Sequence, residues 1–212
     1  MTQADGRADP DARPPVAEPT GREELARKLI HVGASVIAVA IVWLTPALTG
    51  RTMLACAVFV ALAVEILRRL NAGVGRAFLR SFGPLLRAHE THGLTGATML
   101  ALGFLIAALI FPPHVAGVGM LYAGVGDAAS ALVGRRWGSI RFPWGKSVQG
   151  SAAFFAAAVA AGWVAPEVAF LPALVAALAA TLFESFPTVI DDNLILPIVG
   201  ALAAWAAVVL IA

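Results

Sequence analysis

Long apolar segments dominate this chain and constrain what it can fold into. Hydrophobic residues make up 59% of its 212 residues, and charged residues only 13%. A soluble domain is nearer half apolar and a quarter charged, so this composition indicates a membrane protein. A helix needs about 20 mostly apolar residues to cross the hydrocarbon core. The segments that meet or approach this length are residues 29–48, 52–67, 95–111, 114–133, 151–165, 168–183 and 194–211.

These segments predict an all-α fold, a polytopic transmembrane helical bundle of about seven spans within residues 25–212. The fifth and sixth segments are rich in alanine and are separated only by Pro166 and Glu167. A re-entrant pair at that place is the alternative and would leave five full spans. Residues 1–24 are rich in Pro, Asp, Arg and Ala without an apolar period, so we expect a disordered cytoplasmic tail there.

Basic residues fall almost entirely on one side of the predicted bundle. With the N-terminus inside, the inner segments hold fourteen of the fifteen Lys and Arg residues, and Arg51 is the exception. Because cytoplasmic loops carry an excess of Lys and Arg, we expect a cytoplasmic N-terminus. Residues 71–89 have the apolar and basic spacing of an interfacial helix with a kink at Gly83-Pro84. A connecting helix packed on the bundle is the alternative.

Polar residues within or beside the spans gather at the predicted cytoplasmic ends. Charge inside a membrane is costly and marks a functional site by default. The residues of this polar layer are Lys28, His31, Glu65, Arg68, Asp127, Glu184, Asp191, Asp192 and Asn193. Two of them also have structural interpretations: Glu65 could pair with Arg68 within its helix, and His31 could bond a neighbouring backbone.

Asp127 lies deepest in this layer, about 9 Å inside the end of its span at 1.5 Å per residue. A lone carboxylate there needs a cation, a metal or a proton as its partner. Gly126, Ser130 and Gly134 recur around it every four positions. Such a stripe of small residues lets a neighbouring helix come close. We therefore expect Asp127 to have a functional role in a closely packed part of the bundle.

Residues 134–150 combine glycines and cations in one predicted cytoplasmic loop. Its members are Gly134, Gly138, Gly145 and Gly150, with Arg135, Arg136, Arg141 and Lys146. Glycines let backbone N–H groups approach an anion, and the cations neutralise it, so we expect a polyphosphate here. A basic loop without a ligand is the alternative. The segment is not a Walker A loop, because Ile140 stands where that motif needs glycine.

The last predicted cytoplasmic loop, residues 184–193, differs from the others because it has three carboxylates and no Lys or Arg. Mg²⁺ is usually held by one or two carboxylates together with substrate phosphates. The loop therefore predicts metal-nucleotide binding, and a solvated acidic turn is the alternative.

Several elements, in this order, resemble the polyprenol, dolichol and phytol kinase family, which is grouped with CTP-using lipid transferases. The elements are residues 27–31 (RKLIH), 65–68 (EILR), 93–98 (GLTGAT), 126–134 (GDAASALVG), 145–151 (GKSVQGS), Glu184 and 192–197 (DNLILP). The resemblance implies transfer of the γ-phosphate of CTP (or ATP) to a membrane-embedded alcohol, with Mg²⁺. It is a resemblance to the compact members of the family, and it implies a bacterial-type cell (inner) membrane with the active site facing the cytoplasm. Gln149 stands where a Glu is expected in the family, which puts any role of that Glu in doubt here.

Combined with the charge pattern, the resemblance assigns roles to individual residues. The predicted catalytic residues are Asp127 and Glu65. The predicted nucleotide-binding residues are Arg135, Arg136, Gly145, Lys146, Ser147, Gly150, Ser151 and Asn193. The predicted metal ligands are Asp127, Asp191 and Asp192, and the other members of the polar layer are Lys28, His31, Arg68 and Glu184.

Two other functions fit the same pattern. A cytidylyltransferase that makes a CDP-lipid would use the same nucleotide and metal, and a transporter would use Asp127 as a coupling residue. Transporter sites usually lie near the midplane between repeats, and the halves of this chain show no clear repeat. We expect a membrane lipid and a nucleotide as partners and no nucleic acid, and the sequence predicts no oligomeric state.

Overall fold

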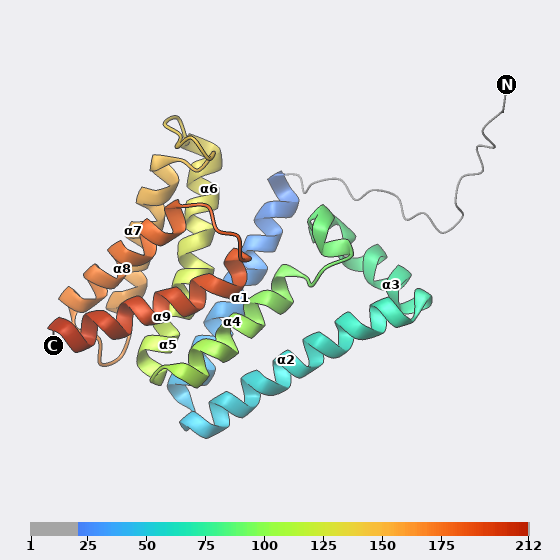
Figure 1. Ribbon diagram of the computed structural model, residues 1–212, viewed down its shortest axis with the longest axis horizontal. Helices are drawn as coiled ribbons and strands as arrows, with labels where there is room; N and C mark the ends of the chain where they lie inside the picture. The colour runs from blue at the N-terminus through green and yellow to red at the C-terminus, as the bar shows by residue number, and fades with distance from the viewer. Residues whose placement is uncertain (1–20, 212) are drawn as a thin grey trace.

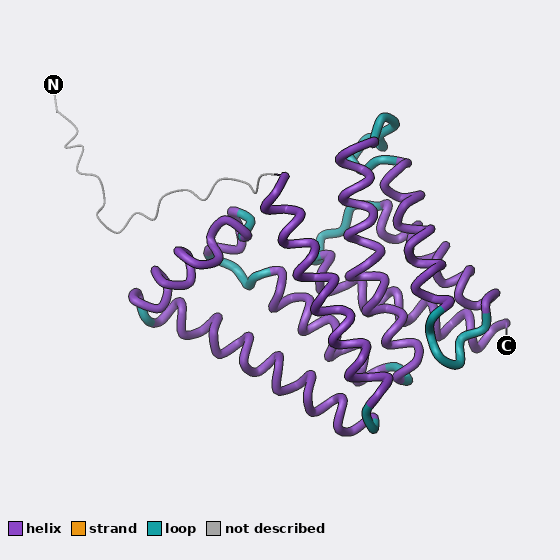
Figure 2. Tube along the Cα trace, turned by 180° about the vertical axis from the view of Figure 1, so that it is seen from behind, coloured by secondary structure: helices purple, strands orange, loops and turns teal. Residues whose placement is uncertain are grey.

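The computed structural model describes residues 21–211, all of whose regular elements are helices (Figures 1 and 2). They are α1 (Gly21–Leu44), α2 (Ala47–Leu70), α3 (Ala72–Phe82), α4 (Gly96–Ile110), α5 (Pro113–Leu121), α6 (Asp127–Trp137), α7 (Val148–Trp163), α8 (Phe170–Ser185) and α9 (Asp192–Ile211), with short helical turns at Gly83–Leu85 and Ala88–Thr91. Residues 1–20 of the predicted tail lie outside the described residues. The last four residues of that tail, 21–24, belong to α1.

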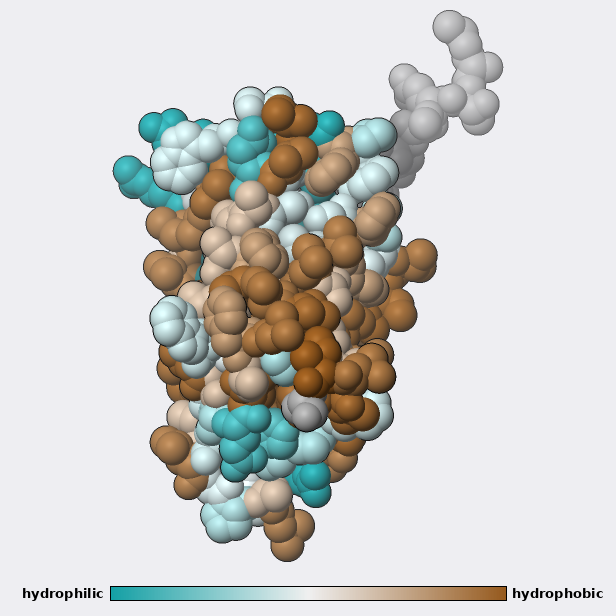
Figure 3. Space-filling view, turned by 90° about the vertical axis from the view of Figure 1, so that its left-hand side faces the viewer, coloured by the Kyte–Doolittle hydropathy of each residue, from teal (hydrophilic) through white to brown (hydrophobic). Residues whose placement is uncertain are grey.

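Each predicted apolar segment corresponds to a helix, which confirms the all-α class. Within residues 21–211, three helices are long and apolar enough to cross a membrane: α1, the continuous helix Pro113–Trp137 and α9. The apolar helices α4, α7 and α8 are shorter, with 15, 16 and 16 residues. Apolar side chains cover a broad belt around the middle of the molecule, and polar side chains gather above and below this belt (Figure 3). These features are those of a membrane protein.

Small residues hold the centre of the bundle together. Helix α9 packs against α4, α5 and α8. A Cβ atom added at Gly103 would lie 2.6 Å from the carbonyl oxygen of Leu194, so only glycine allows α4 to approach α9 this closely. Gly119 makes an equally tight approach of α5 to α9 at Ala201. Close backbone packing at small residues is how helices associate in lipid, where the hydrophobic effect between them is weak.

A short π-helical segment, Tyr122–Gly126, joins α5 to α6 without breaking the helix. The Asp127 N–H reaches the carbonyl oxygen of Tyr122, five residues back, instead of four. Such π segments widen a helix by one residue and are frequent at functional sites. The widened turn lies directly before Asp127 and therefore sets the direction in which this carboxylate points.

The α6–α7 connection is shorter than the predicted loop of residues 134–150. Helix α6 continues to Trp137 and α7 begins at Val148, so the segment without helix is residues 138–147. The reason is the small-residue stripe. A Cβ atom on Gly134 would lie 2.8 Å from Ser147 Oγ, and one on Gly150 would lie 2.9 Å from the carbonyl oxygen of Ser130. The two helices therefore stay in contact up to the loop, and the Ser147 hydroxyl caps α7 by accepting the Gly150 N–H at 3.1 Å.

The elements that carry the polar residues meet at one end of the bundle. The start of α1, the α6–α7 loop and the α8–α9 connection lie at the upper end in Figure 1, whereas the α1–α2 and α4–α5 turns lie at the lower end. Beside them, α3 ends at Phe82 and the chain turns at Gly83–Leu85, which confirms the predicted break at Gly83-Pro84.

Candidate functional site

A cavity of about 340 Å³, which we call the polar cavity, opens at this end between α1, α6, the α6–α7 loop and the α8–α9 connection. Its lining combines five cations with four carboxylates. They are Lys28, Arg87, Arg135, Arg141 and Lys146, with Glu24, Asp127, Glu184 and Asp192. Ser130, Ala131, Gly134, Gly145 and Ser147 complete the lining. Residues more than 150 positions apart in the sequence thus share one space.

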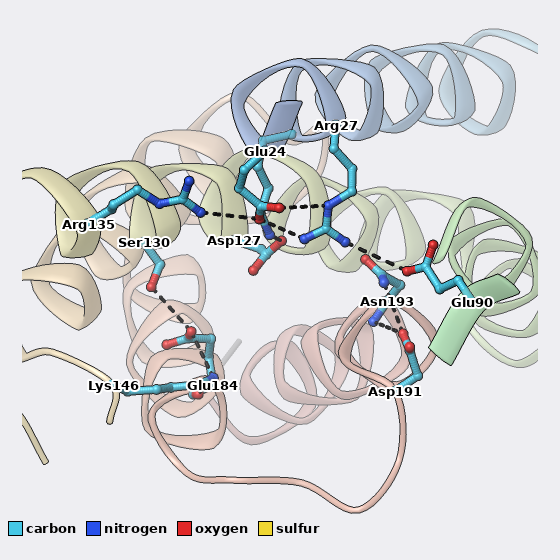
Figure 4. A network of polar contacts seen from close by, with 11 residues as sticks. Glu24, Arg27, Glu90, Asp127, Ser130, Arg135, Lys146, Glu184, Asp191 and Asn193 are labelled. Carbon is cyan, nitrogen blue, oxygen red and sulfur yellow. Dashed lines mark hydrogen bonds and ion pairs between the residues drawn. The ribbon is translucent and has the colours of Figure 1, made fainter. Parts of the chain in front are cut away.

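The wall formed by α1 is a network of ion pairs (Figure 4). Lys28 pairs with Asp127 of α6, and their side chains are only 6% and 17% exposed. Arg27 donates two hydrogen bonds to Glu24, at 2.6 and 3.0 Å. Arg135 of α6 lies 3.8 Å from the same Glu24 carboxylate. Buried charges of opposite sign are close enough here to offset much of each other's desolvation cost.

The opposite wall is formed by the α6–α7 loop and the end of α8. Lys146 donates a hydrogen bond to Glu184 Oε1 at 2.9 Å and a second one to the Glu184 carbonyl oxygen. The Ser130 hydroxyl donates to the same Oε1 at 3.2 Å. Glu184 Oε2 is buried and has no hydrogen-bond partner among the described residues. A buried carboxylate oxygen without a partner is costly, so it marks a place where a cation or a donor would be stabilised.

The predicted metal ligands do not form a preset cage. Within residues 21–211, no three side chains of His, Cys, Asp or Glu are arranged to hold a metal ion. Asp127 and Asp192 both line the polar cavity, whereas Asp191 lines a neighbouring one and accepts two hydrogen bonds from Asn193, each 2.9 Å long. Mg²⁺ usually takes one or two carboxylates plus phosphate oxygens, so this donor set fits Mg²⁺ brought in with a nucleotide.

A second cavity, of about 530 Å³, adjoins the polar cavity and shares Arg87, Lys146 and Asp192 with it. Phe186 lies on its wall and carries a stack of aromatic rings. The ring centroids of Phe186 and Trp144 lie 5.3 Å apart, and those of Trp144 and Phe142 also lie 5.3 Å apart. Trp144 is anchored by a 2.6 Å hydrogen bond to the Ser185 carbonyl oxygen. The stack therefore presents the exposed Phe186 ring beside a cluster of charges.

Glu65 and Arg68 lie apart from the polar cavity and form a buried clamp. Arg68 donates to Glu65 Oε2 at 2.6 Å and to the Gly93 carbonyl oxygen at 2.7 Å. Glu65 Oε1 accepts from the Thr95 N–H at 2.8 Å and from the Thr98 hydroxyl at 3.1 Å. Both side chains are 3% exposed. The pair joins the end of α2 to the start of α4, which agrees with the structural interpretation of this ion pair.

The remaining predicted residues divide between the polar cavity and its supports. The predicted residues that line the cavity are Lys28, Asp127, Arg135, Gly145, Lys146, Ser147, Glu184 and Asp192. Gly150 packs against α6, and Ser151 shares a 2.8 Å hydrogen bond with Ser185. Arg136 points over Trp137, 5.9 Å from its ring centroid, and Asn193 is buried against Asp191. His31 lines a different cavity, described below.

The sequence interpretation missed Glu24, Arg87, Ser130 and Arg141 as individual site residues, although all four line the polar cavity. Two of them carry a local signal. Glu24 lies three residues before Arg27, and Ser130 lies three residues after Asp127, so each shares a helix face with a predicted or buried charge. Glu24 fell in the predicted tail, and Arg87 follows a helix break that hides its direction.

Comparisons with known proteins bear on the family of this chain. No family model matches the chain, and no solved structure matches it. A Rickettsia prowazekii protein named "Uncharacterized protein RP860" is 26% identical over 185 residues, which cover 82% of this chain and 90% of that protein. A protein of Synechocystis sp. named "Phytol kinase" is 32% identical over 197 residues, which cover 86% of this chain and 79% of the relative. The chain belongs to the polyprenol and phytol kinase-like family.

Membership of this phytol kinase-like family confirms the family-level resemblance drawn from the ordered sequence elements. The matched part covers most of the chain, so it includes helices that line the polar cavity as well as helices that surround them.

Proposed function

We propose that this protein is a lipid-alcohol kinase, which transfers the γ-phosphate of CTP or ATP to a membrane-embedded prenyl alcohol such as phytol or a polyprenol. The observation that carries the proposal is the polar cavity, in which five cations and four carboxylates meet at one end of an apolar bundle. The similarity to a phytol kinase supports the same activity. We place the cavity at the cytoplasmic face, with about seven spans and the N-terminus inside, because the basic residues favour that orientation.

The triphosphate would lie in the polar cavity. Lys146, Arg135 and Arg141 line it, and charge-assisted hydrogen bonds from such groups to phosphate are about twice as strong as neutral ones. The nucleoside would extend into the adjoining cavity, where Phe186 offers a ring for stacking. The shared residues Arg87 and Lys146 would lie where phosphates and ribose meet.

Asp127 and Asp192 would hold Mg²⁺ together with phosphate oxygens. Bound there, the ion would neutralise charge that develops on the transferred phosphoryl group. Phosphoryl transfer otherwise depends mostly on positioning and on charge stabilisation. Lys28 holds the Asp127 carboxylate at the inner wall of the cavity. The ion pair between Arg27 and Glu24 stabilises the same turn of α1.

Asp127 is favoured over Glu65 as the carboxylate that orients the alcohol and accepts its proton. Both oxygens of Glu65 already accept hydrogen bonds in the buried clamp, so Glu65 has no free acceptor for the alcohol, although it lines the cavity beside α1 and α2 that is described below. The oxygen of the alcohol would attack the γ-phosphorus, the bond from that phosphorus to the bridging oxygen would break, and the nucleoside diphosphate would leave.

The test is lipid phosphorylation by the purified full-length protein in detergent or nanodiscs. CTP and ATP labelled at the γ-phosphate are supplied with phytol, a polyprenol or diacylglycerol. Label on a prenyl alcohol is expected. A parallel assay supplies α-labelled CTP with phosphatidate or a prenyl phosphate. Label on that lipid phosphate, with no label on any alcohol from γ-labelled nucleotide, would instead identify a cytidylyltransferase and overturn the proposal.

A further inference from the structure

A third cavity near the same end of the bundle is lined mainly by apolar side chains, and we call it the apolar cavity. It measures about 380 Å³, within the range of small-molecule sites. Helices α1 to α4 and the turn after α3 enclose it. Its apolar lining includes Ile30, Ala61, Val64, Phe78, Phe82, Leu85 and Leu86. Ile30, Val64 and Phe82 are 52%, 38% and 50% exposed, so the apolar wall continues to the surface of the bundle.

One end of the apolar cavity carries three buried polar atoms that have no hydrogen-bond partner among the described residues. They are Arg27 Nη1, His31 Nδ1 and Glu90 Oε1. The three residues are only 5%, 4% and 2% exposed, and all three line the cavity. Arg27 Nη1 and Glu90 Oε1 form an ion pair at 3.9 Å, which is too long for a hydrogen bond. A buried polar atom without a hydrogen bond is costly, so three such atoms lining one cavity indicate a site for a polar ligand group.

The combination of donors and acceptors selects a hydroxyl group. A hydroxyl has one donor and two acceptor lone pairs. Arg27 Nη1 offers a donor, and Glu90 Oε1 offers an acceptor. His31 Nδ1 offers either, depending on its tautomer. A carboxylate ligand would meet the Glu90 carboxylate, and a hydrocarbon would leave all three atoms unpaired.

We propose that the apolar cavity binds the hydroxyl end of a long-chain alcohol, with the hydroxyl between Arg27, His31 and Glu90 and the rest of the chain passing into lipid beside Ile30, Val64 and Phe82. This inference rests on the proposed kinase function for the fate of the alcohol, but the binding itself does not require it. The cavity would hold the reacting end, and the chain would leave it where the apolar wall reaches the surface.

The position of α1 connects this site to the nucleotide. Glu24 and Lys28 line the polar cavity, whereas Arg27 and His31 line the apolar cavity. A single stretch of two helical turns therefore separates the proposed alcohol from the proposed triphosphate. Asp127 pairs with Lys28, which lies one residue after Arg27 and three residues before His31 in α1. The alcohol would approach the phosphate past this stretch of α1, at Asp127.

Photolabelling of the full-length protein in nanodiscs tests the site without relying on turnover. The probe is a C20 prenyl alcohol with a diazirine near its hydroxyl end. Adducts are expected in α2 near Ala61 and in residues 78–86, and excess phytol should remove them. The methyl ether of phytol, which lacks the hydroxyl donor, should compete at least tenfold less well. Adducts confined to other helices, or equal competition by alcohol and ether, would overturn the inference.

Two variants sharpen this test. Ala61→Phe fills the cavity and should lower labelling at least tenfold, whereas Ala57→Phe, one turn away on α2 and outside the lining, should leave it unchanged. His31→Ala should remove the preference for alcohol over ether. Its thermal unfolding transition should stay close to that of the parent, which would show that the protein is still folded.

The outcomes separate the two proposals. Labelling of the cavity without phosphorylation of any alcohol contradicts the kinase alone. Phosphorylation that Ala61→Phe leaves unchanged contradicts the cavity alone.

Discussion

Lys28 and Asp127, 99 residues apart in the sequence, form an ion pair that joins α1 to α6 at the inner wall of the polar cavity. The pair connects α1, which lies between the polar cavity and the apolar cavity, with α6, which directly follows the π segment Tyr122–Gly126. Breaking such a pair leaves a buried charge without a partner, so substitution of either member is expected to be costly.

Asp127→Asn should lower kcat for lipid phosphorylation by about 10²- to 10⁴-fold, the range for loss of a general base. The change keeps the shape of the side chain, so the helical circular dichroism signal should be retained. Steady-state kinetics with γ-labelled nucleotide would measure the loss. Glu167→Gln, an exposed acid in the α7–α8 turn, is the matched control and should keep full activity. Activity of Asp127→Asn within threefold of the parent would contradict the role of Asp127.

Glu65→Gln should act on stability more than on chemistry. Removing one partner of a buried ion pair costs about 3–5 kcal/mol, and Glu65 also accepts hydrogen bonds from Thr95 and Thr98. The thermal midpoint in detergent should fall clearly, while kcat of the folded fraction stays within a few-fold of the parent. A large loss of kcat at an unchanged midpoint would return Glu65 to the list of candidate bases.

Arg135 and Arg136 are adjacent arginines that differ in position: the first lines the polar cavity, and the second does not. Arg135→Met should weaken nucleotide binding by about fivefold. The Arg135 side chain is half-exposed, and an ion pair between such a side chain and a phosphate contributes up to about 1 kcal/mol. Arg136→Met makes the same change in charge and should have no effect. Binding of a fluorescent trinitrophenyl nucleotide would compare them. Equal effects of the two substitutions would show that only net charge matters.

Phe186→Ala should raise the KM for nucleotide with little change in kcat. Stacking of a base on an aromatic ring contributes about 1–3 kcal/mol, which corresponds to roughly five- to a hundredfold in affinity. Phe170→Ala, an exposed phenylalanine at the start of α8, is the control and should bind nucleotide normally. An unchanged KM in Phe186→Ala would remove the adjoining cavity from the nucleotide site.

The predicted sidedness can be measured with single cysteines, because Cys56 is the only natural one. In a Cys56→Ser background, Ser139→Cys in the α6–α7 loop should react with a membrane-impermeant maleimide only in inside-out vesicles. Ala169→Cys in the α7–α8 connection should react only in right-side-out vesicles. Both positions are exposed. Labelling of both from the same side would indicate the re-entrant alternative for α7 and α8.

Much of the fold and part of the site could be predicted because charge inside an apolar run is conspicuous. Asp127 and Lys28 stand out in that way, and both line the polar cavity. Glu24 does not stand out, because it lies among other polar residues before the first apolar segment. Its role depends on α1 starting earlier, at Gly21, than the apolar pattern does.

The direction of a side chain was harder to predict than its depth. Glu65 and Asp127 both lie near the predicted cytoplasmic ends of spans, and no local pattern distinguishes their roles. Packing separates them: α2 lies at the flank of the bundle against α3 and α4, so Glu65 meets Arg68 and Thr95 instead of the polar cavity. The length of the α6–α7 loop was hard to predict for the same reason. It depends on the contact between Gly134 and Ser147, which no local pattern reveals.

The π segment at Tyr122–Gly126 makes the length of this stretch matter as much as its composition. Each residue of an α-helix advances about 100° around the axis, so deleting one residue there would restore a regular helix and rotate α6 by about that angle relative to α5. Asp127 would then face away from Lys28, and Gly134 would no longer pack against α7. Among related chains, substitutions in this stretch should therefore be far more common than insertions or deletions, and an alignment gap between Tyr122 and Asp127 should accompany loss of activity.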